Sequence, residues 1–224
     1  MASTSVTSDR PSEAVSGVTL HHRLEPEDQA RADFYALLAR LYAGAPDAPL
    51  LRAIATAAPL ADASESAAAP GTLPAAWDML RAASAAMDAS AAVDEYNVLF
   101  VGVGKSELNL HASFWLTGFM METPLVDVRA TLARLGLGRR PQVSLVEDHL
   151  SALLETMRIL VAGQDERRPA LVAEQRDFFA AHLEPWVFSC CSAISNCPVA
   201  NYYRRVAQFT DMFMALERDS FAID

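Results

Sequence analysis

Three adjacent polar residues, Glu147, Asp148 and His149, are the part of the sequence best suited to chemistry. Carboxylates bind the guanidinium group of arginine, and a histidine beside an aspartate can transfer protons or hold a ligand. Two interpretations of His149 are open at this stage. It is either a half-buried histidine hydrogen-bonded to a neighbour, or one member of an Asp–His pair displayed beside a binding groove.

A catalytic centre is not supported by the rest of the sequence. Asp148 and His149 would supply two members of a catalytic triad, but the chain contains no Gly-x-Ser-x-Gly nucleophile motif. His111 and His182 are far from His149 in the sequence, and none of the three belongs to a His-Glu-x-x-His zinc motif. We therefore expect a protein that is not an enzyme, with no catalytic residue, no metal site and no cofactor.

Three cysteines, Cys190, Cys191 and Cys197, lack the Cys-x-x-Cys spacing of a zinc or redox site. An odd number of cysteines with two adjacent is not a disulfide framework, which indicates a reducing compartment. Buried thiols in a helical core are the simplest interpretation. A cysteine-ligated metal or redox protein remains an alternative from a different functional class.

The segment Gly102–Ser106 resembles the end of a phosphate-binding loop. A P-loop requires Gly-x-x-x-x-Gly-Lys-Ser/Thr after a buried strand. Leu99 occupies the position of the first glycine, and the residues before it have a helical pattern. We expect Gly102 and Gly104 to end a helix instead.

Composition narrows the class of protein and of partner. The chain has 224 residues, of which 52% are hydrophobic and only nine are glycine, and this favours helices. A formal net charge of −10 argues against nucleic acid and anionic membranes as partners. The first twenty residues lack the apolar segment of a secretory signal, and no apolar run approaches the roughly 18 residues of a membrane span. A cytoplasmic protein is expected.

Apolar residues recur at helical spacing over Ser144–Gly163. Ser144 and Glu147 have the spacing of a capping box, so we expect this helix to begin at Ser144 and to end at Gly163. His149 would then lie one turn inside the helix, at the edge of its apolar stripe.

The whole pattern predicts an all-α, single-domain multi-helix bundle over residues 25–224, preceded by a disordered tail at 1–24. Residues 58–74 are interpreted as a surface linker, and 107–123 as an apolar segment that is helical or partly extended. The other helices are expected at 25–42, 49–57, 74–87, 91–101, 124–135, 169–182, 185–197 and 198–218.

Four short motifs occur in an order that resembles one protein family. They are Glu-Tyr-Asn-Val-Leu-Phe-Val-Gly at 95–102, Ser-x-Trp-Leu at 113–116, Glu-Asp-His at 147–149 and His-Leu-Glu-Pro-Trp at 182–186. Together with the helical pattern, they are similar to the TorD/DmsD family of cytosolic chaperones for molybdenum enzymes, which is related to the NarJ type. The resemblance covers about residues 30–216.

The resemblance implies a chaperone that binds the twin-arginine signal peptide of a molybdopterin oxidoreductase in its apo form until cofactor insertion and folding are complete. The resemblance also implies which residues bind the peptide. The family's Asp–His pair corresponds to Asp148 and His149, with the adjoining carboxylate of Glu147. Its groove wall corresponds to Tyr96, Leu99 and Phe100, and a nearby aromatic residue to Trp115. The chain departs from the family at Gly102-Val103, where Gly-Pro is usual, and at Leu145-Val146, where Glu-Pro is usual. The second departure removes one carboxylate that would suit an arginine of the peptide.

The nearest alternative is a NarJ-type assembly chaperone for a nitrate reductase catalytic subunit, which binds a remnant leader without the arginine pair. The Ser-x-Trp-Leu and His-Leu-Glu-Pro-Trp motifs favour the TorD/DmsD type. Either a monomer or a helix-swapped dimer agrees with the sequence.

Overall fold

The computed structural model describes residues 24–60, 71–102, 106–139, 142, 144–164 and 167–223. Over these residues the chain forms ten α-helices and one π-helical segment, with isolated bridges but no strand, so the all-α prediction is confirmed. None of the described helices is long and apolar enough to cross a membrane. The elements are α1 (Pro26–Ala43), α2 (Ala48–Thr56), α3 (Leu73–Ala86), α4 (Ala89–Tyr96), η1 (Asn97–Val101), α5 (Ala112–Thr117), α6 (Thr123–Arg134), α7 (Leu150–Ala162), α8 (Val172–His182), α9 (Glu184–Asn196) and α10 (Tyr202–Phe221).

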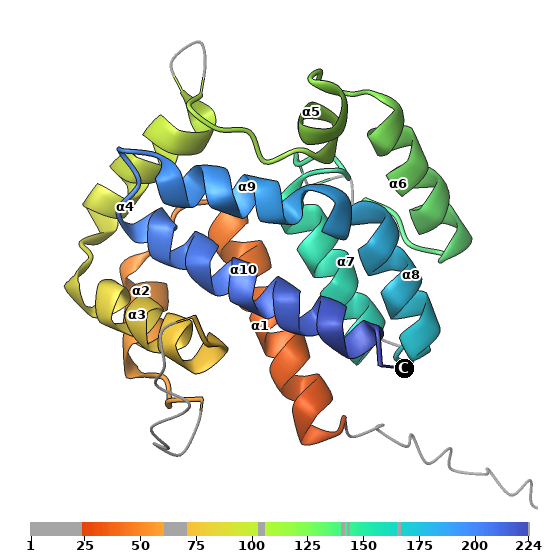
Figure 1. Cartoon of the computed structure of the whole chain (residues 1–224), viewed down its shortest axis with the longest axis horizontal. Coiled ribbons are helices and arrows are strands. Elements are labelled where there is room, and N and C mark those ends of the chain that lie inside the picture. The colour runs from red at the N-terminus through yellow and green to blue at the C-terminus, as the bar shows by residue number, and fades with distance from the viewer. Residues whose placement is uncertain are drawn as a thin grey trace, which may run out of the picture.

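The long helices form two packed pairs. Helix α1 packs against α7, and α9 packs against α10 in front of them (Figure 1). The short α2–α3 pair lies at one side of the bundle and the α5–α6 pair at the opposite side, where α5 contacts α9 and α6 contacts α8. The α5–α6 pair is therefore attached to the bundle by the start of α5 and one face of α6.

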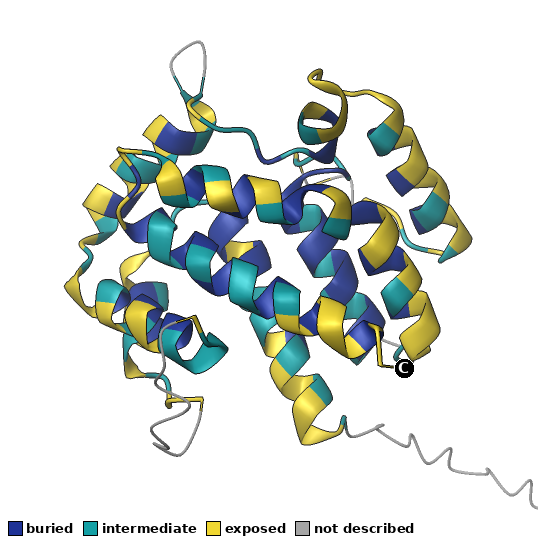
Figure 2. Ribbon diagram, in the orientation of Figure 1, coloured by how far each residue is buried: buried dark blue, intermediate teal, exposed yellow. Residues whose placement is uncertain are grey.

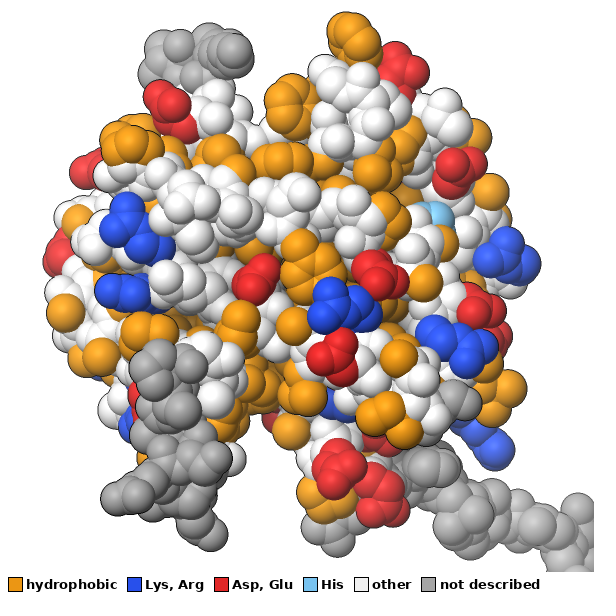
Figure 3. Space-filling view, viewed as in Figure 1, with side chains coloured by type: hydrophobic (Ala, Val, Ile, Leu, Met, Phe, Trp, Pro, Cys, Tyr) orange, Lys and Arg blue, Asp and Glu red, His pale blue; other side chains and the backbone are white. Residues whose placement is uncertain are grey.

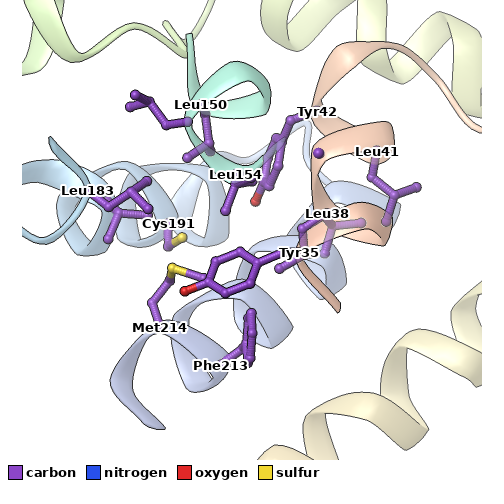
Figure 4. Close-up of a cluster of buried hydrophobic side chains, with 14 of the residues drawn as sticks. Tyr35, Leu38, Leu41, Tyr42, Leu150, Leu154, Leu183, Cys191, Phe213 and Met214 are labelled. Atoms are coloured by element: carbon purple, nitrogen blue, oxygen red, sulfur yellow. The ribbon is translucent and has the colours of Figure 1, made fainter. Parts of the chain in front are cut away.

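The core lies where the two helix pairs meet. Tyr35 and Tyr42 of α1, Leu154 of α7 and Phe213 of α10 converge there, all within 1% of complete burial (Figure 4). Buried positions line the inner faces of these helices, and exposed positions face outward (Figure 2). Complete burial of one such side chain contributes about 1.5–3 kcal/mol, so this meeting point supplies much of the fold's stability.

Helix starts are fixed by side-chain caps that the sequence provides. Asp47 accepts a hydrogen bond from the backbone N–H of Leu50 at the start of α2, and Asp88 does so from Ser90 at the start of α4. The cap of α10 comes from a different helix. The carboxylate of Glu95 on α4 accepts the backbone N–H groups of Asn201, Tyr202 and Tyr203 at 2.8, 3.0 and 2.8 Å. Glu95 therefore links α4 to the start of the last helix.

A buried ion pair connects the first and last helices. Arg31 of α1 donates two hydrogen bonds, at 2.7 and 2.8 Å, to the carboxylate of Glu217 on α10, which is 2% exposed. Tyr35 donates its hydroxyl to the same carboxylate at 2.8 Å, and Arg31 also donates to Gln175 of α8. Three helices thus share one charge-assisted network.

The start of the central helix is corrected by the structure. Helix α7 begins at Leu150, six positions after the expected start at Ser144, and the predicted capping box is not formed. Asp148 lies in a turn and His149 is extended beside His111, and Ala112 N–H donates to Asp148 O while Leu150 N–H donates to the carbonyl of Leu110. This long-range pairing replaces the helical conformation that the local pattern predicted for these residues. The predicted end at Gly163 is confirmed: its φ is +75°, and a Cβ there would collide with the carbonyl oxygen of Arg167.

The other helices occur close to their expected positions, with one unexpected feature. The segment predicted as a single helix over 91–101 becomes π-helical after Tyr96, and Gly102 N–H donates to Asn97 O at 2.7 Å. Gly102, at φ +68°, ends this segment as predicted, whereas Gly104 lies outside the described residues. Residues 1–23 of the predicted tail and the middle of the predicted linker, 61–70, also lie outside them.

Candidate functional site

Asp148 is buried and fully engaged within the protein. Its side chain is 1% exposed, and Oδ2 accepts hydrogen bonds from the backbone N–H and the hydroxyl of Ser113 at 3.0 and 2.6 Å. Ser113 also accepts the backbone N–H of Glu122 at 3.3 Å. Asp148 therefore anchors the segment from the start of α5 to the start of α6. Ser113 lies in the Ser-x-Trp-Leu motif, but sequence spacing gave no sign that it meets Asp148.

His149 is the N-cap of α7 and a neutral buried side chain. Its Nδ1 accepts the backbone N–H of Ser151 at 3.1 Å, which leaves the proton on Nε2. Its ring lies edge-on to the ring of His111, with centroids 4.8 Å apart. Burial first, and then the charge of His111, lowers the pKa of His149 to about 3. The Asp–His pair is thus held inside the protein and is not displayed on its surface.

Glu147 is the more accessible of the two carboxylates, and it already binds arginine. Arg129 of α6 donates its Nε–H to Oε2 at 3.0 Å and forms an ion pair with the same oxygen at 2.9 Å through a terminal nitrogen, and Arg139 approaches Oε1 at 3.6 Å. Partial burial is the largest single influence and raises the pKa of Glu147, but the hydrogen bond from Arg129, a backbone hydrogen bond and the charges of Arg129 and Arg139 together outweigh it, so the net pKa is lowered. This carboxylate therefore stays ionised and receives guanidinium groups, which the sequence did not reveal because Arg129 lies 18 positions away.

A cavity of about 380 Å³ opens beside Glu147. It is bounded by α7, the end of α6 and the loop between them, and its walls are mostly apolar, with a second carboxylate at Glu155. Such a site, apolar with a few placed charges, suits part of a peptide or a small ligand. Its apolar lining includes Ala43, Leu132, Leu137, Leu145, Ala152 and Ile159.

The side chains of Tyr96 and Phe100 form an aromatic cluster at η1, with Leu99 between them in the sequence. Leu99 is fully buried, whereas Tyr96 and Phe100 are half-buried, with ring centroids 5.2 Å apart. Both rings also contact Tyr203 of α10. The π-helical backbone keeps this cluster together although it is not an α-helical face. Only Tyr96 and Phe100 of the three have surface to offer to a partner.

Trp115 lies on α5 beside the anchored residue Ser113. Its ring is half-buried, and its indole N–H donates to the carbonyl of Asn109 at 2.8 Å. The apolar residues around it could, from the sequence alone, lie either in the core or on the surface, and they are exposed. Phe119 is 69% exposed and Met121 is 70% exposed. The apolar pattern alone did not distinguish these two outcomes.

The aromatic cluster and the Asp148–His149 pair both adjoin the segment that contains Leu108 and Leu110. Leu108 N–H donates to Leu99 O, and Leu150 N–H donates to Leu110 O. Leu108 and Leu110 are two residues apart, which limits their separation to about 7 Å. The aromatic cluster and the Asp148–His149 pair therefore do not lie on opposite sides of the molecule.

The matched turn at 182–186 holds two helices together. Trp186 is buried and its indole N–H donates to the carbonyl of His182, whose Nε2 meets the hydroxyl of Thr131 on α6. Burial lowers the pKa of His182, so this ring is held neutral as well. These contacts fix α8, α9 and α6 relative to one another.

The cysteines are free thiols. Cys190 and Cys191 are buried, and burial raises the pKa of both, which disfavours the thiolate that a metal or redox site requires. Over the part of the chain that the structure describes, no group of three or more His, Cys, Asp and Glu side chains is placed to hold a metal ion. The cysteine-ligated alternative therefore receives no support from the geometry.

A comparison with protein families identifies the class of protein. The family model described as nitrate reductase delta subunit matches residues 66–192 of the chain. The chain belongs to the nitrate reductase delta subunit family. This is the family of NarJ- and TorD-type redox enzyme maturation chaperones, so the expected relationship is confirmed and the chain is a molybdoenzyme assembly chaperone. No curated protein matches the chain.

Proposed function

We propose that this chaperone binds the twin-arginine signal peptide of a molybdopterin oxidoreductase and holds the enzyme for cofactor insertion and folding before export. The observation that carries the proposal is Glu147, a carboxylate bound by two guanidinium groups of its own chain beside a mostly apolar cavity. A twin-arginine leader offers two guanidinium groups followed by an apolar stretch. It therefore has the chemistry to replace Arg129 and Arg139 and to cover apolar surface.

The predicted site residues then have two kinds of role. Glu147 receives an arginine, and the exposed parts of Tyr96, Phe100 and Trp115 contact apolar residues of the peptide. Leu99 and the Asp148–His149 pair are buried and position these surfaces from behind. Asp148 acts through Ser113 on α5, and His149 acts by fixing the start of α7.

A NarJ-type role in assembling a nitrate reductase catalytic subunit is the second candidate, and the description of the matching family favours it. Such a client carries a remnant leader without the arginine pair. The apolar contacts would be the same, but Glu147 would keep its own arginines. The two candidates therefore differ in whether binding depends on the arginine pair.

The deciding experiment is affinity purification from the native host followed by mass spectrometry of the co-purifying proteins. A molybdopterin oxidoreductase is expected. Its leader is then titrated calorimetrically, with a matched peptide in which both arginines are alanine. A loss of at least about tenfold in affinity, or 1.4 kcal/mol, supports the twin-arginine proposal. Equal binding of both peptides, or a nitrate reductase subunit whose leader lacks the pair, supports the second candidate. If no molybdoenzyme co-purifies, both are wrong.

A further inference from the structure

An exposed apolar surface covers α5 and the turn that follows it. We call it the α5 surface, and its members are Phe114, Leu116, Phe119, Met120 and Met121. Each of the five side chains is at least 41% exposed although all are large and apolar. Single exposed apolar residues are ordinary, but a contiguous group of this kind marks an interaction site.

The backbone at Met121 is in a conformation that methionine disfavours. Its φ is +61°, and among the residues that the structure describes it is the one non-glycine with a positive φ. Glycine adopts this region without steric penalty. A methionine here gives up backbone stability and in return presents a side chain that is 70% exposed. The local conformation thus favours glycine, whereas the surface it forms favours an apolar side chain.

The charged residues in the sequence around the α5 surface are acidic. Residues 106–128 include Glu107, Glu122 and Asp127 but no lysine or arginine; of the cations that flank this range, Arg129 is paired with Glu147 and Lys105 lies outside the described residues. Orange and red side chains lie together over α5 and the turn to α6 at the upper right of Figure 3, without blue among them. An occupant with cationic residues next to an apolar stretch complements this surface. A second copy of the chain does not, because each copy carries a formal net charge of −10.

The surface is held in place by the buried anchor of the candidate site. The Ser113 hydroxyl donates to Asp148 and accepts the backbone N–H of Glu122. The first bond fastens the start of the segment 113–122 to Asp148, just before α7, and the second joins the end of the segment back to Ser113. The exposed methionines between them are adaptable in shape, which suits apolar segments that differ in sequence.

We propose that the α5 surface binds the apolar segment of the client's leader peptide, with cationic residues of the peptide other than the arginine pair near the bordering carboxylates. This rests on the proposed function, that the chaperone binds the leader. It adds a second contact region to the one around Glu147. The leader's arginines and its apolar segment are then recognised by different elements, α6–α7 and α5.

The test uses the full chain with Phe119→Ser and Met121→Gly combined, and Leu171→Ser as the matched control. Leu171 is 73% exposed at the start of α8, away from the α5 surface. Met121→Gly removes the side chain while relieving the backbone, so its melting temperature should equal or exceed that of the wild type. The probes are the leader peptide of the co-purifying molybdoenzyme and a truncated form that keeps the arginines but lacks the apolar segment.

The double variant is expected to bind the full leader at least tenfold more weakly than the wild type, whereas Leu171→Ser binds it equally. The truncated peptide should not distinguish the double variant from the wild type. Equal affinity of wild type and double variant for the full leader overturns the proposal alone. A change in oligomeric state with unchanged leader affinity assigns the surface to a second copy and also overturns it. If the wild type binds no leader, the proposed function fails as well.

Discussion

Asp148 and Ser113 are joined by two hydrogen bonds in the interior, across 35 positions of sequence. The carboxylate receives both the backbone N–H and the hydroxyl, and neither residue is more than 1% exposed. The bond of 2.6 Å has the length of a charge-assisted hydrogen bond. This relationship couples the start of α5 to the start of α7 and makes Asp148 a positioning residue.

Substitution of Asp148 should therefore reduce stability as well as leader binding. Asp148→Ala leaves a buried N–H and a buried hydroxyl without their acceptor, which costs about 1–3 kcal/mol. Asp148→Asn retains an amide oxygen and should cost less. Urea denaturation of both variants measures this. A double-mutant cycle with Ser113→Ala should show coupling of at least about 0.5 kcal/mol, and strict additivity would contradict the assignment.

His149 should make stability depend on pH below neutrality. Its pKa is about 3 in the folded protein because of burial and the nearby His111, against about 6.5 in an unfolded chain. Above pH 6.5 the ring is neutral in both states and has no effect. As the pH falls from 6.5 towards 3, the unfolded state takes up a proton that the folded state does not, so the free energy of unfolding decreases.

His149→Asn removes this dependence while keeping a side-chain acceptor for the Ser151 N–H. One proton corresponds to a slope of about 1.4 kcal/mol per pH unit. Between pH 6 and pH 4, the free energy of unfolding of the wild type should fall relative to that of the variant with a slope that approaches this value. Above pH 7 the difference between the two proteins should not change with pH. Denaturation at a series of pH values measures it. Parallel curves for the two proteins would show that His149 is not buried in its neutral form.

The sequence predicted the elements well but not the contacts that bring them together. Gly163 ended its helix as expected because a positive φ and a close backbone approach are local requirements. The start of the same helix was wrong because Asp148 and His149 pair with residues near position 111, and no local pattern reports such a distant pairing. For the same reason the partners of Glu147 and Asp148 were not foreseen.

The aromatic cluster shows the same limit in a different form. The family resemblance grouped Tyr96, Leu99 and Phe100, and the structure brings the rings of Tyr96 and Phe100 into contact, but no local pattern indicated the π-helical backbone. Apolar character also failed to separate the core from the α5 surface. Phe213 and Phe119 are the same residue type, and only the tertiary structure buries one and exposes the other.

Glu95 should stabilise the start of α10 from outside that helix. Three backbone N–H groups donate to its carboxylate, and a helix start otherwise leaves such groups without partners. We expect Glu95→Ala to cost about 1–3 kcal/mol and Glu95→Gln to cost less, since an amide oxygen can still accept. Thermal denaturation provides the measurement. A melting temperature of Glu95→Ala equal to that of the wild type would contradict this capping role.

Arg129 and a leader arginine should compete for Glu147. Arg129→Ala removes the closest guanidinium from this carboxylate at little cost in stability, because Arg129 is half exposed and such pairs contribute about 0–1 kcal/mol. Leader affinity should then rise a few-fold, whereas Glu147→Gln should lower it and weaken its dependence on salt. Arg81→Ala on α3 is the control, since it removes the same charge from a pair with Asp78 at a distant surface. Calorimetric titration of the three variants at two salt concentrations decides between specific competition and a general effect of charge. Equal gains from Arg129→Ala and Arg81→Ala would mean that only net charge matters, and Glu147 would not be the arginine-binding residue.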